Sequence, residues 1–371
     1  MSSSQTIQLG IVGSCGRGGA FRSCLDALGT IRASAICDLK QDELEQSRQE
    51  LGADHAFTDY GQMLDEAKPD AVLVATPMPL HVPHAIAALQ RDIHVLSEVP
   101  AGVSIEQCQS LVAAAKKSRA IYMMAENYNY HRPNQIVKAL VEQGLFGELY
   151  YAEGEYVHEL KDLNVQTPWR RQWQTGINGV TYPTHSLGPI LQWMQGDRVA
   201  SVCCAGSGHH YQDAHGRAYE IEDSCVMLCK MASGGLAKIR LDMLSNRPHA
   251  MHNYQLQGTD GCYESARAEG ERDRIWLRER AAGANTWMAL EDLAPEFMPQ
   301  NWQTYGNLAA DAGHGGGDLL VLAEFVEVIQ GGHPNSLGVH EAMDMTLPGL
   351  VSQQSIVESG QWMDVPDSRT W

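Results

Sequence analysis

Length, composition and charge already limit what this chain can do. It has 371 residues, 44% hydrophobic and 19% charged, which is enough core-forming material for two domains of ordinary globular composition. Its formal net charge of −18 excludes a surface suited to nucleic acid or to anionic lipid, because both repel a strongly acidic protein.

The beginning of the chain, MSSSQTIQLGIVG, has neither a basic segment followed by a long apolar one nor a twin arginine. No run of about 18 apolar residues occurs elsewhere in the sequence. Nine cysteines without a C-x-x-C pair favour reduced, buried thiols over disulfides or a structural zinc site. We therefore expect a soluble, cytoplasmic protein.

Residues 1–127 alternate between short apolar runs and amphipathic segments, which is typical of strands joined by helices. Five apolar runs predict strands, at 7–13, 32–38, 70–77, 93–100 and 120–127. The segments between them predict helices at 41–52, 81–90 and 104–118. Because parallel strands need such helical crossovers, we predict an α/β fold whose first domain, residues 1–127, is a Rossmann dinucleotide-binding domain.

From residue 128 onward the pattern changes. A helix is expected at 131–147, strands are expected at 148–160, 199–207, 223–231, 234–244 and 251–258, and helices return at 317–330 and 338–359. The later strands follow one another without helices between them, which favours a mostly antiparallel sheet. Residues 128–371 are therefore predicted to form a second α/β domain, whose C-terminal helix can pack back onto the first.

The stretch GIVGSCGRGGAF, residues 10–21, indicates a dinucleotide site. Gly13, Gly16 and Gly18 come directly after the first predicted strand, where glycines let the backbone approach a pyrophosphate at the start of the following helix. Asp38 ends the second predicted strand, and its carboxylate can accept hydrogen bonds from an adenosine ribose. Arg17, within the turn, is a further expected coenzyme contact.

Asp38 also bears on which coenzyme is bound. Its negative charge would repel the 2′-phosphate of NADP, so the sequence predicts NAD. Lys40 and Arg17 keep NADP open as the alternative, because either cation could capture that phosphate.

Three further segments follow in order: ATPMPLHVPHAIAAL (75–89), SEVPAGV (97–103) and AENYNYHRPNQIVKALVEQGLFGEL (125–149). Together they resemble the Gfo/Idh/MocA family of sugar oxidoreductases, and the resemblance extends over nearly the whole chain. It implies an NAD-binding Rossmann domain and a second domain with a large open-faced sheet that often forms oligomer contacts, so a homodimer or homotetramer is expected. By the same resemblance, five residues would line the coenzyme: Thr76, Pro77, His81, Glu98 and Asn127.

Val99 departs from that family, in which a lysine between glutamate and proline transfers the proton of the substrate hydroxyl. A valine has no group that can carry a proton. The string Glu-Val-Pro-Ala at 98–101 instead resembles a narrower NAD-dependent glycosidase branch, whose named activity is α-N-acetylgalactosaminidase. Five other strings are similar to that branch: AENYNY (125–130), EGEYVHEL (153–160), PWRRQW (168–173), NGVTYPTHSLGP (178–189) and GHGGGD (313–318).

The narrower resemblance also implies which residues act on the substrate. The expected catalytic residues are Tyr156, Tyr182 and His185. Trp169 and Arg170 are expected to contact the coenzyme. The expected substrate contacts are His158, which shares a strand face with Tyr156, and His314 and Asp318.

NAD-dependent glycosidases are an exception to the usual pair of catalytic carboxylates. The coenzyme takes a hydride from C3 of the sugar, the resulting ketone acidifies the C2 proton, the aglycone leaves by elimination, water adds, and the hydride returns. Histidine, with an unperturbed pKa of about 6.5, suits removal of the C3 hydroxyl proton, which favours His185. Tyrosine, with a pKa of about 10, needs a stabilised phenolate to remove the C2 proton, and Tyr156 and Tyr182 are both candidates.

Two other functions stay open at this point. A plain sugar or glycoside dehydrogenase would stop at the 3-keto product and release NADH, and a non-catalytic NAD-binding sensor would need no base. His81 and His84 have helical spacing that can hold a metal, but no third ligand accompanies them, so no metal site is predicted. The expected partner is a carbohydrate or glycoside, with no nucleic acid and no membrane.

Overall fold

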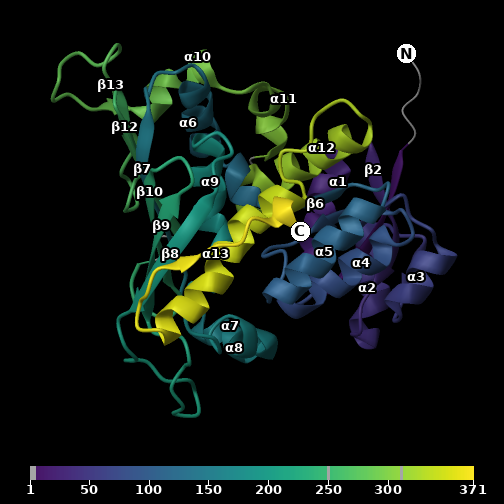
Figure 1. Cartoon of the computed structure of the whole chain (residues 1–371). Helices are drawn as coiled ribbons and strands as arrows, with labels where there is room; N and C mark the ends of the chain where they lie inside the picture. Colours follow the sequence, from purple (N-terminus) through teal and green to yellow (C-terminus); the bar gives the residue numbers. More distant parts are fainter. Residues whose placement is uncertain (1–5, 249–250, 310–311) are drawn as a thin grey trace. The chain divides into compact units, whose positions relative to one another are not determined.

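Two compact units make up the computed structural model, which describes residues 6–248, 251–309 and 312–371 (Figure 1). The first unit contains Met1–Tyr130, Thr304–Met343 and Ser368–Trp371, and the second contains His131–Gln303 and Asp344–Asp367. The sequence predicted a single boundary after residue 127, so the structure differs by placing a late segment in the first unit. The physical reason is packing, since α12 (Gly317–Ile329) contacts α1 (Arg22–Leu28) and the 3-10 turn η3 (Asn127–Tyr130).

The first unit is built on a parallel sheet with the strand order β3-β2-β1-β4-β5-β6. Its strands are β1 (Ile7–Val12), β2 (Ile31–Cys37), β3 (His55–Phe57), β4 (Ala71–Val74), β5 (His94–Ser97) and β6 (Tyr122–Met124). Beside α1 and α12, its helices are α2 (Gln41–Leu51), α3 (Tyr60–Glu66), α4 (His81–Leu89) and α5 (Ile105–Lys117), with 3-10 turns η1 (Arg17–Phe21), η2 (Met78–Leu80), η5 (His314–Gly316) and η6 (Ser368–Thr370). The predicted strands and helices of residues 1–127 are confirmed, and the structure adds β3 and α3.

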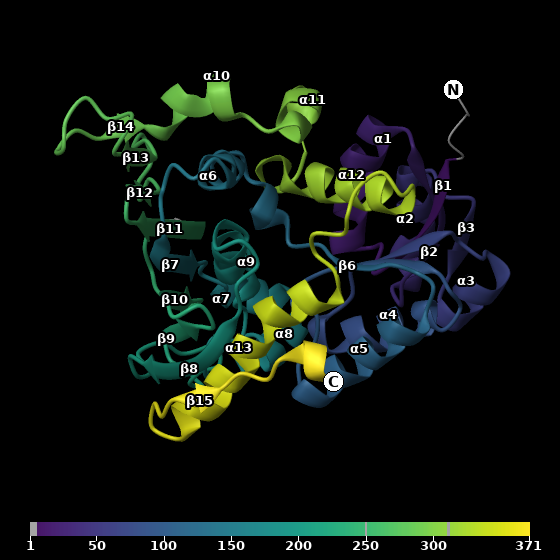
Figure 2. The same ribbon diagram turned by 45° about the horizontal axis from the view of Figure 1, so that its top comes forward.

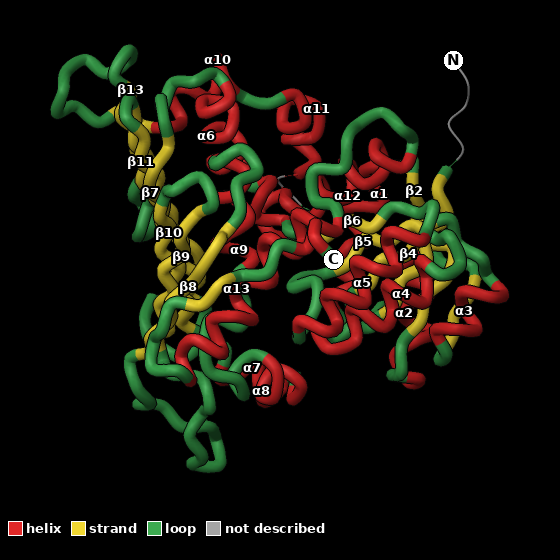
Figure 3. Tube along the Cα trace, in the orientation of Figure 1, coloured by secondary structure: helices red, strands yellow, loops and turns green. Residues whose placement is uncertain are grey.

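Continuous apolar runs form these strands because helices cover both faces of the parallel sheet, as Figure 3 shows for the first unit. The side chains of Leu9, Ile11, Val72, Leu73 and Leu96 have no exposed surface. Full burial of each such side chain contributes about 1.5–3 kcal/mol, so this sheet is the core of the first unit.

The second unit contains a mixed sheet with the strand order β14-β13-β12-β11-β7-β10-β9-β8-β15. Its strands are β7 (Leu149–Val157), β8 (Val199–Gly206), β9 (Ser224–Met231), β10 (Leu236–Asp242), β11 (Met251–Gly258), β12 (Gly261–Glu264), β13 (Arg274–Leu277), β14 (Met288–Ala289) and β15 (Met363–Asp364). Within the described residues, only β7 and β10 pair in parallel, so the prediction of a mostly antiparallel sheet is confirmed. The sequence missed β12 to β15 because such short strands show too little alternation.

The helices of the second unit are α6 (Arg132–Glu142), α7 (Lys161–Gln166), α8 (Pro168–Trp173), α9 (Thr184–Trp193) and α10 (Ala294–Phe297), with the 3-10 turn η4 (Leu290–Leu293). Figure 2 shows α6 and α9 together on one face of the sheet. Two more helices, α11 (Gln300–Ala309) and α13 (Val339–Val357), have residues in both units. None of the helices in the described ranges is long and apolar enough to cross a membrane.

Two glycines of the second unit let α9 and the segment before it lie close to their neighbours. A Cβ atom at Gly154 in β7 would lie 2.9 Å from the carbonyl oxygen of Ser186, so α9 packs directly on β7. A Cβ atom at Gly349 in α13 would lie 2.6 Å from the carbonyl oxygen of Val180, so α13 packs against the segment that precedes α9. The first contact holds α9 against β7, the strand that carries Tyr156, and the second holds the segment before α9 against α13.

We predict that Gly154→Ala destabilises the protein, because the added methyl group must displace the backbone of α9. Overpacking of this kind costs about 1–3 kcal/mol, which lowers the midpoint of thermal unfolding by a few degrees. Gly332→Ala is the matched control, since a Cβ atom there would meet only the carbonyl oxygen of Glu327, at 3.6 Å. Thermal unfolding of both variants checks the prediction, and equal midpoints would contradict it.

Candidate active site

Three glycines of the turn after β1 have three separate functions, as a dinucleotide site requires. Gly13 has φ +86°, and a Cβ atom there would lie 2.4 Å from the carbonyl oxygen of Ala75, so only glycine permits this turn. A Cβ atom at Gly18 would lie 2.7 Å from the side chain of Ile11, so this glycine lets η1 pack on β1. A Cβ atom at Gly16 would meet a single atom, at 3.9 Å, which leaves open space where the backbone can approach a pyrophosphate.

Asp38 lies just after β2 and joins the end of that strand to the glycine-rich turn. Its Oδ2 atom accepts a hydrogen bond from Cys15 N at 2.9 Å, and its Oδ1 atom accepts one from Lys40 N at 3.0 Å. The ammonium group of Lys40 lies 3.0 Å from the carboxylate of Glu43, so a carboxylate already neutralises it. This pattern of charges opposes a 2′-phosphate and fits NAD.

His81 joins the turns that follow β4 and β5. Its Nε2 atom lies 2.8 Å from the carbonyl oxygen of Thr76, and its Nδ1 atom lies 2.8 Å from the carbonyl oxygen of Pro100. The ring is buried, and burial lowers the pKa of His81. His81 therefore holds together the two turns that carry Pro77 and Glu98, and its contact with the coenzyme stays a prediction.

Asp318 and Arg17 join the glycine-rich turn to the first turn of α12. Arg17 donates from Nη1 and Nη2 to the two carboxylate oxygens of Asp318, at 2.8 and 2.6 Å, and from Nε to Glu98 Oε1 at 2.8 Å. Asn127 Nδ2 donates to Asp318 at 2.8 Å, and His314 Nδ1 lies 2.9 Å from the same carboxylate. Burial alone would raise the pKa of Asp318, but the hydrogen bonds from His314 and Arg17 hold it well below its usual range.

The side chain of Asp318 has no exposed surface and contacts Arg17 and Asn127. Contact of His314 and Asp318 with the substrate stays a prediction. One glycine of the string GHGGGD is needed for close packing. A Cβ atom at Gly317 would lie 2.4 Å from the carbonyl oxygen of Asn127. Sequence reasoning could not find the pair of Arg17 and Asp318, which are 301 residues apart.

In the second unit, the three predicted catalytic residues lie together. Tyr156 belongs to β7, Tyr182 precedes α9, and His185 lies in the first turn of α9. The ring centroid of His185 lies 5.1 Å from that of Tyr156 and 5.1 Å from that of Tyr182, and the two tyrosine rings are 5.7 Å apart. His158 Nδ1 lies 2.8 Å from the hydroxyl of Tyr156. These four residues are termed the tyrosine–histidine cluster below.

Two residues of β11 support this cluster and were missed by sequence reasoning. The hydroxyl of Tyr254 donates a hydrogen bond to the carbonyl oxygen of His185, and His252 lies opposite Tyr156 in the pairing of β11 with β7. Burial, and after it the proximity of His185, lowers the pKa of His252 to about 4, so its ring is neutral at pH 7. The sequence could have indicated these two residues, since both fall on one face of the strand predicted at 251–258.

Trp169 and Arg170, two predicted coenzyme contacts, lie on the short helix α8 of the second unit. The guanidinium of Arg170 stacks on the ring of Trp169 at 4.5 Å and donates to Gln174 Oε1 at 3.0 Å. The neighbouring Arg171 lies 3.6 Å from the carboxylate of Asp213. Contact of Trp169 and Arg170 with the coenzyme stays a prediction.

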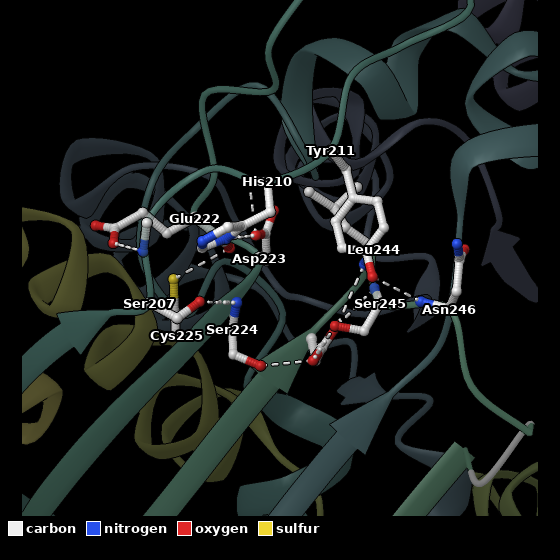
Figure 4. A network of polar contacts seen from close by, with 12 residues as sticks. Ser207, His210, Tyr211, Glu222, Asp223, Ser224, Cys225, Leu244, Ser245 and Asn246 are labelled. Carbon is white, nitrogen blue, oxygen red and sulfur yellow. Dashed lines mark hydrogen bonds and ion pairs between the residues drawn. The ribbon is translucent and has the colours of Figure 1, made fainter.

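Figure 4 shows a polar network that holds the loop before β9 beside the ends of β9 and β10. His210 Nδ1 lies 2.6 Å from the carboxylate of Asp223, which anchors the loop at the start of β9. Ser245 donates from its hydroxyl to the carboxylate of Asp242 at 2.8 Å, and the carbonyl oxygen of Asp242 accepts a hydrogen bond from His158 N at 2.9 Å. The network therefore fixes the backbone that carries His158.

In the described ranges, no group of three histidine, cysteine, aspartate or glutamate side chains is placed to hold a metal ion. His84, with His81 the candidate pair of the sequence, has its Nδ1 atom 3.2 Å from the hydroxyl of Thr76. Burial, and after it the proximity of His81, lowers the pKa of His84 to about 4.

Comparison with known protein families gives two matches that divide the chain. Residues 7–126 match the family model described as oxidoreductase family, NAD-binding Rossmann fold, and residues 130–370 match glycosyl hydrolase 109, C-terminal domain. The chain belongs to glycosyl hydrolase family 109. Its N-terminal domain is an NAD-binding Rossmann domain, and family and fold together make this family 109 member an NAD-dependent enzyme.

Relatives of this family 109 enzyme align with nearly all of the chain. A glycosyl hydrolase family 109 protein of Saccharopolyspora erythraea is 29% identical over 392 residues, which cover 98% of this chain and 83% of the relative. The α-N-acetylgalactosaminidase of Shewanella oneidensis is 28% identical over 396 residues, which cover 98% of this chain and 85% of the relative. Among solved structures, a levoglucosan dehydrogenase in complex with NADH and levoglucosan superimposes with a TM-score of 0.83 at 17% identity, covering 98% of this chain and 100% of the other, and thus shares the fold.

The side chains of the first unit fit NAD. Gly16 leaves open space beside the turn, and Asp38 presents a carboxylate after β2. Asn127 is buried, and within the described residues its Oδ1 atom has no hydrogen-bond partner. An unsatisfied acceptor of this kind suits a ligand that carries an amide donor, as nicotinamide does.

We predict that His252→Gln makes the stability of this family 109 enzyme less dependent on pH. The pKa of His252 is about 4 in the folded chain, against about 6.5 when unfolded, so as the pH falls below 6.5 the unfolded state binds a proton that the folded state excludes. Between pH 6.5 and pH 5 this one group lowers the free energy of unfolding by about 1–2 kcal/mol.

Thermal unfolding at pH 7 and pH 5 measures this effect, and the drop in midpoint should be smaller in His252→Gln than in the wild type. His55→Gln is the control, since the side chain of His55 is exposed and the drop should stay as in the wild type. An equal drop in all three proteins would show that His252 is not held neutral by burial.

Proposed function

We propose that this family 109 enzyme cleaves a pyranoside by oxidation at C3, elimination across C1 and C2, addition of water and reduction at C3. The observation that supports this most is the tyrosine–histidine cluster, which offers two kinds of proton carrier within a glycosidase-family domain. Val99 is 3% exposed and offers none. NAD, when bound, accepts the C3 hydride and returns it, so that the overall reaction is a hydrolysis.

His185 takes the proton of the C3 hydroxyl in this proposal and gives it back in the last step. Its position supports that role, because the packing of α9 on Gly154 and the hydrogen bond from Tyr254 hold the backbone of His185 in place. An imidazole that is already held in place loses little conformational entropy when the substrate binds. Positioning of this kind increases the rate.

Tyr156 removes the proton from C2. The 2.8 Å contact between its hydroxyl and His158 Nδ1 supports this choice over Tyr182, since an imidazole that donates to the oxygen favours the phenolate. Loss of the C2 proton and of the aglycone oxygen from C1 leaves a double bond between C1 and C2. Water then adds: its oxygen joins C1, Tyr156, whose hydroxyl exchanges its proton with solvent, returns a proton to C2, and the proton that water loses goes to the departed aglycone oxygen.

Glycosides of N-acetylgalactosamine are the first substrates to test, because one relative is an α-N-acetylgalactosaminidase. In a screen of nitrophenyl glycosides with NAD, we expect nitrophenol to appear without net formation of NADH. Product formed in deuterium oxide should carry deuterium at C2. Net NADH with a keto-sugar product would instead indicate a dehydrogenase, and NAD binding without turnover of any glycoside would indicate a sensor.

We predict that His185→Ala loses more than nine-tenths of the turnover of the wild type, because no other residue takes the C3 hydroxyl proton. General acid–base catalysis of this kind contributes a factor of about 10²–10⁴. The control is His209→Ala, which removes an exposed histidine of the same unit and should leave turnover unchanged. Folding and NAD content are checked first, and a loaded His185→Ala protein that keeps more than a tenth of the turnover would refute the assignment.

A further inference from the structure

Two carboxylates surround one guanidinium in the first unit. Arg17 makes two hydrogen bonds to Asp318 and one to Glu98, and its guanidinium lies 4.6 Å from the ring centroid of Phe21. The side chain of Asp318 has no exposed surface, while those of Glu98 and Arg17 are 12% and 24% exposed. These three charged residues, termed the Arg17 cluster, therefore carry one more negative than positive charge.

Two neighbouring residues complete the surroundings of the Arg17 cluster. His314, whose side chain is 38% exposed, contacts Asp318 at the outer side. Asn127 contacts Asp318 and is neutral. In the described part of the chain, Arg17 is the only arginine or lysine that pairs with Asp318 or Glu98. The surplus charge is therefore negative whenever His314 is neutral.

The strand order places this charge at one half of the coenzyme site. In the order β3-β2-β1-β4-β5-β6, a dinucleotide binds outside the carboxyl ends of the strands and across the gap between β1 and β4. Asp38, after β2, marks the adenosine half. Glu98 follows β5 and Asn127 follows β6, so the Arg17 cluster belongs to the nicotinamide half.

Nicotinamide changes its charge when it is reduced. The oxidised ring carries one positive charge and the reduced ring carries none. A fixed negative charge beside the ring therefore stabilises the oxidised form more than the reduced form, and a buried charge does so more strongly because water screens it less.

We propose that the Arg17 cluster, through the charge of Asp318, makes the enzyme bind NAD in preference to NADH. The preference drives hydride back to C3 at the end of each cycle and returns the enzyme to its oxidised resting form. The binding preference concerns the coenzyme alone, whereas its effect on the return of hydride to C3 rests on the proposed function.

Asp318→Asn tests this proposal, because it removes the charge and keeps the size of the side chain. The dissociation constants of NAD and NADH are measured by calorimetry on full-length protein freed of coenzyme. The ratio of the NADH constant to the NAD constant should fall about threefold to tenfold from its wild-type value. No glycoside is present, so failure to find any glycosidase activity leaves this result untouched.

Asp54→Asn is the matched control, because Asp54 also pairs with an arginine, Arg32, at 2.6 Å but lies at the opposite end of the sheet, before β3. Its ratio should equal that of the wild type. If Asp318→Asn does not fold, Glu98→Gln removes the other carboxylate charge and should lower the ratio in the same direction. A folded variant in which both constants change by the same factor overturns the proposal and leaves Asp318 a purely structural role.

Discussion

A buried valine in the turn after β5 limits which side chains of this enzyme can carry protons. Val99 lies between Glu98, whose carboxylate is paired with Arg17, and Pro100, whose carbonyl oxygen contacts His81. The turn therefore has no free proton carrier of its own. In the reaction that we propose, the proton carriers therefore come from other side chains, namely those of the tyrosine–histidine cluster of the second unit.

Glycines position both groups of functional residues, because each removes a side chain that would keep two backbones apart. Gly13 and Gly317 let backbone segments approach in the first unit, so the glycine-rich turn meets β4 and α12 meets Asn127. Gly154 does the same for α9 and β7 in the second unit. The polar side chains are then held by elements that have little room to shift, as preorganised sites require.

Local pattern was enough to predict the long elements but not the tertiary pairs. Apolar runs located β1, β2 and β4 to β6, because burial on both faces leaves a continuous signal. The strands β12 to β14 are two to four residues long and carry too little periodicity to be recognised. The contact of Asp318 with Arg17 and the support of Tyr156 by His252 depend on packing between segments far apart in the sequence, which a single sequence does not record.

The two sites differ in how they handle charge, and the difference follows from what moves in each. Hydride transfer changes the charge of the coenzyme, and the first unit carries fixed ions. Removing one partner from a buried ion pair costs about 3–5 kcal/mol. Proton transfer instead needs groups that can be neutral before and after the step. The second unit supplies tyrosines and imidazoles, and burial keeps His252 uncharged beside His185. The neighbour of His185 in β11 is therefore an uncharged imidazole, which suits the role that we propose for His185.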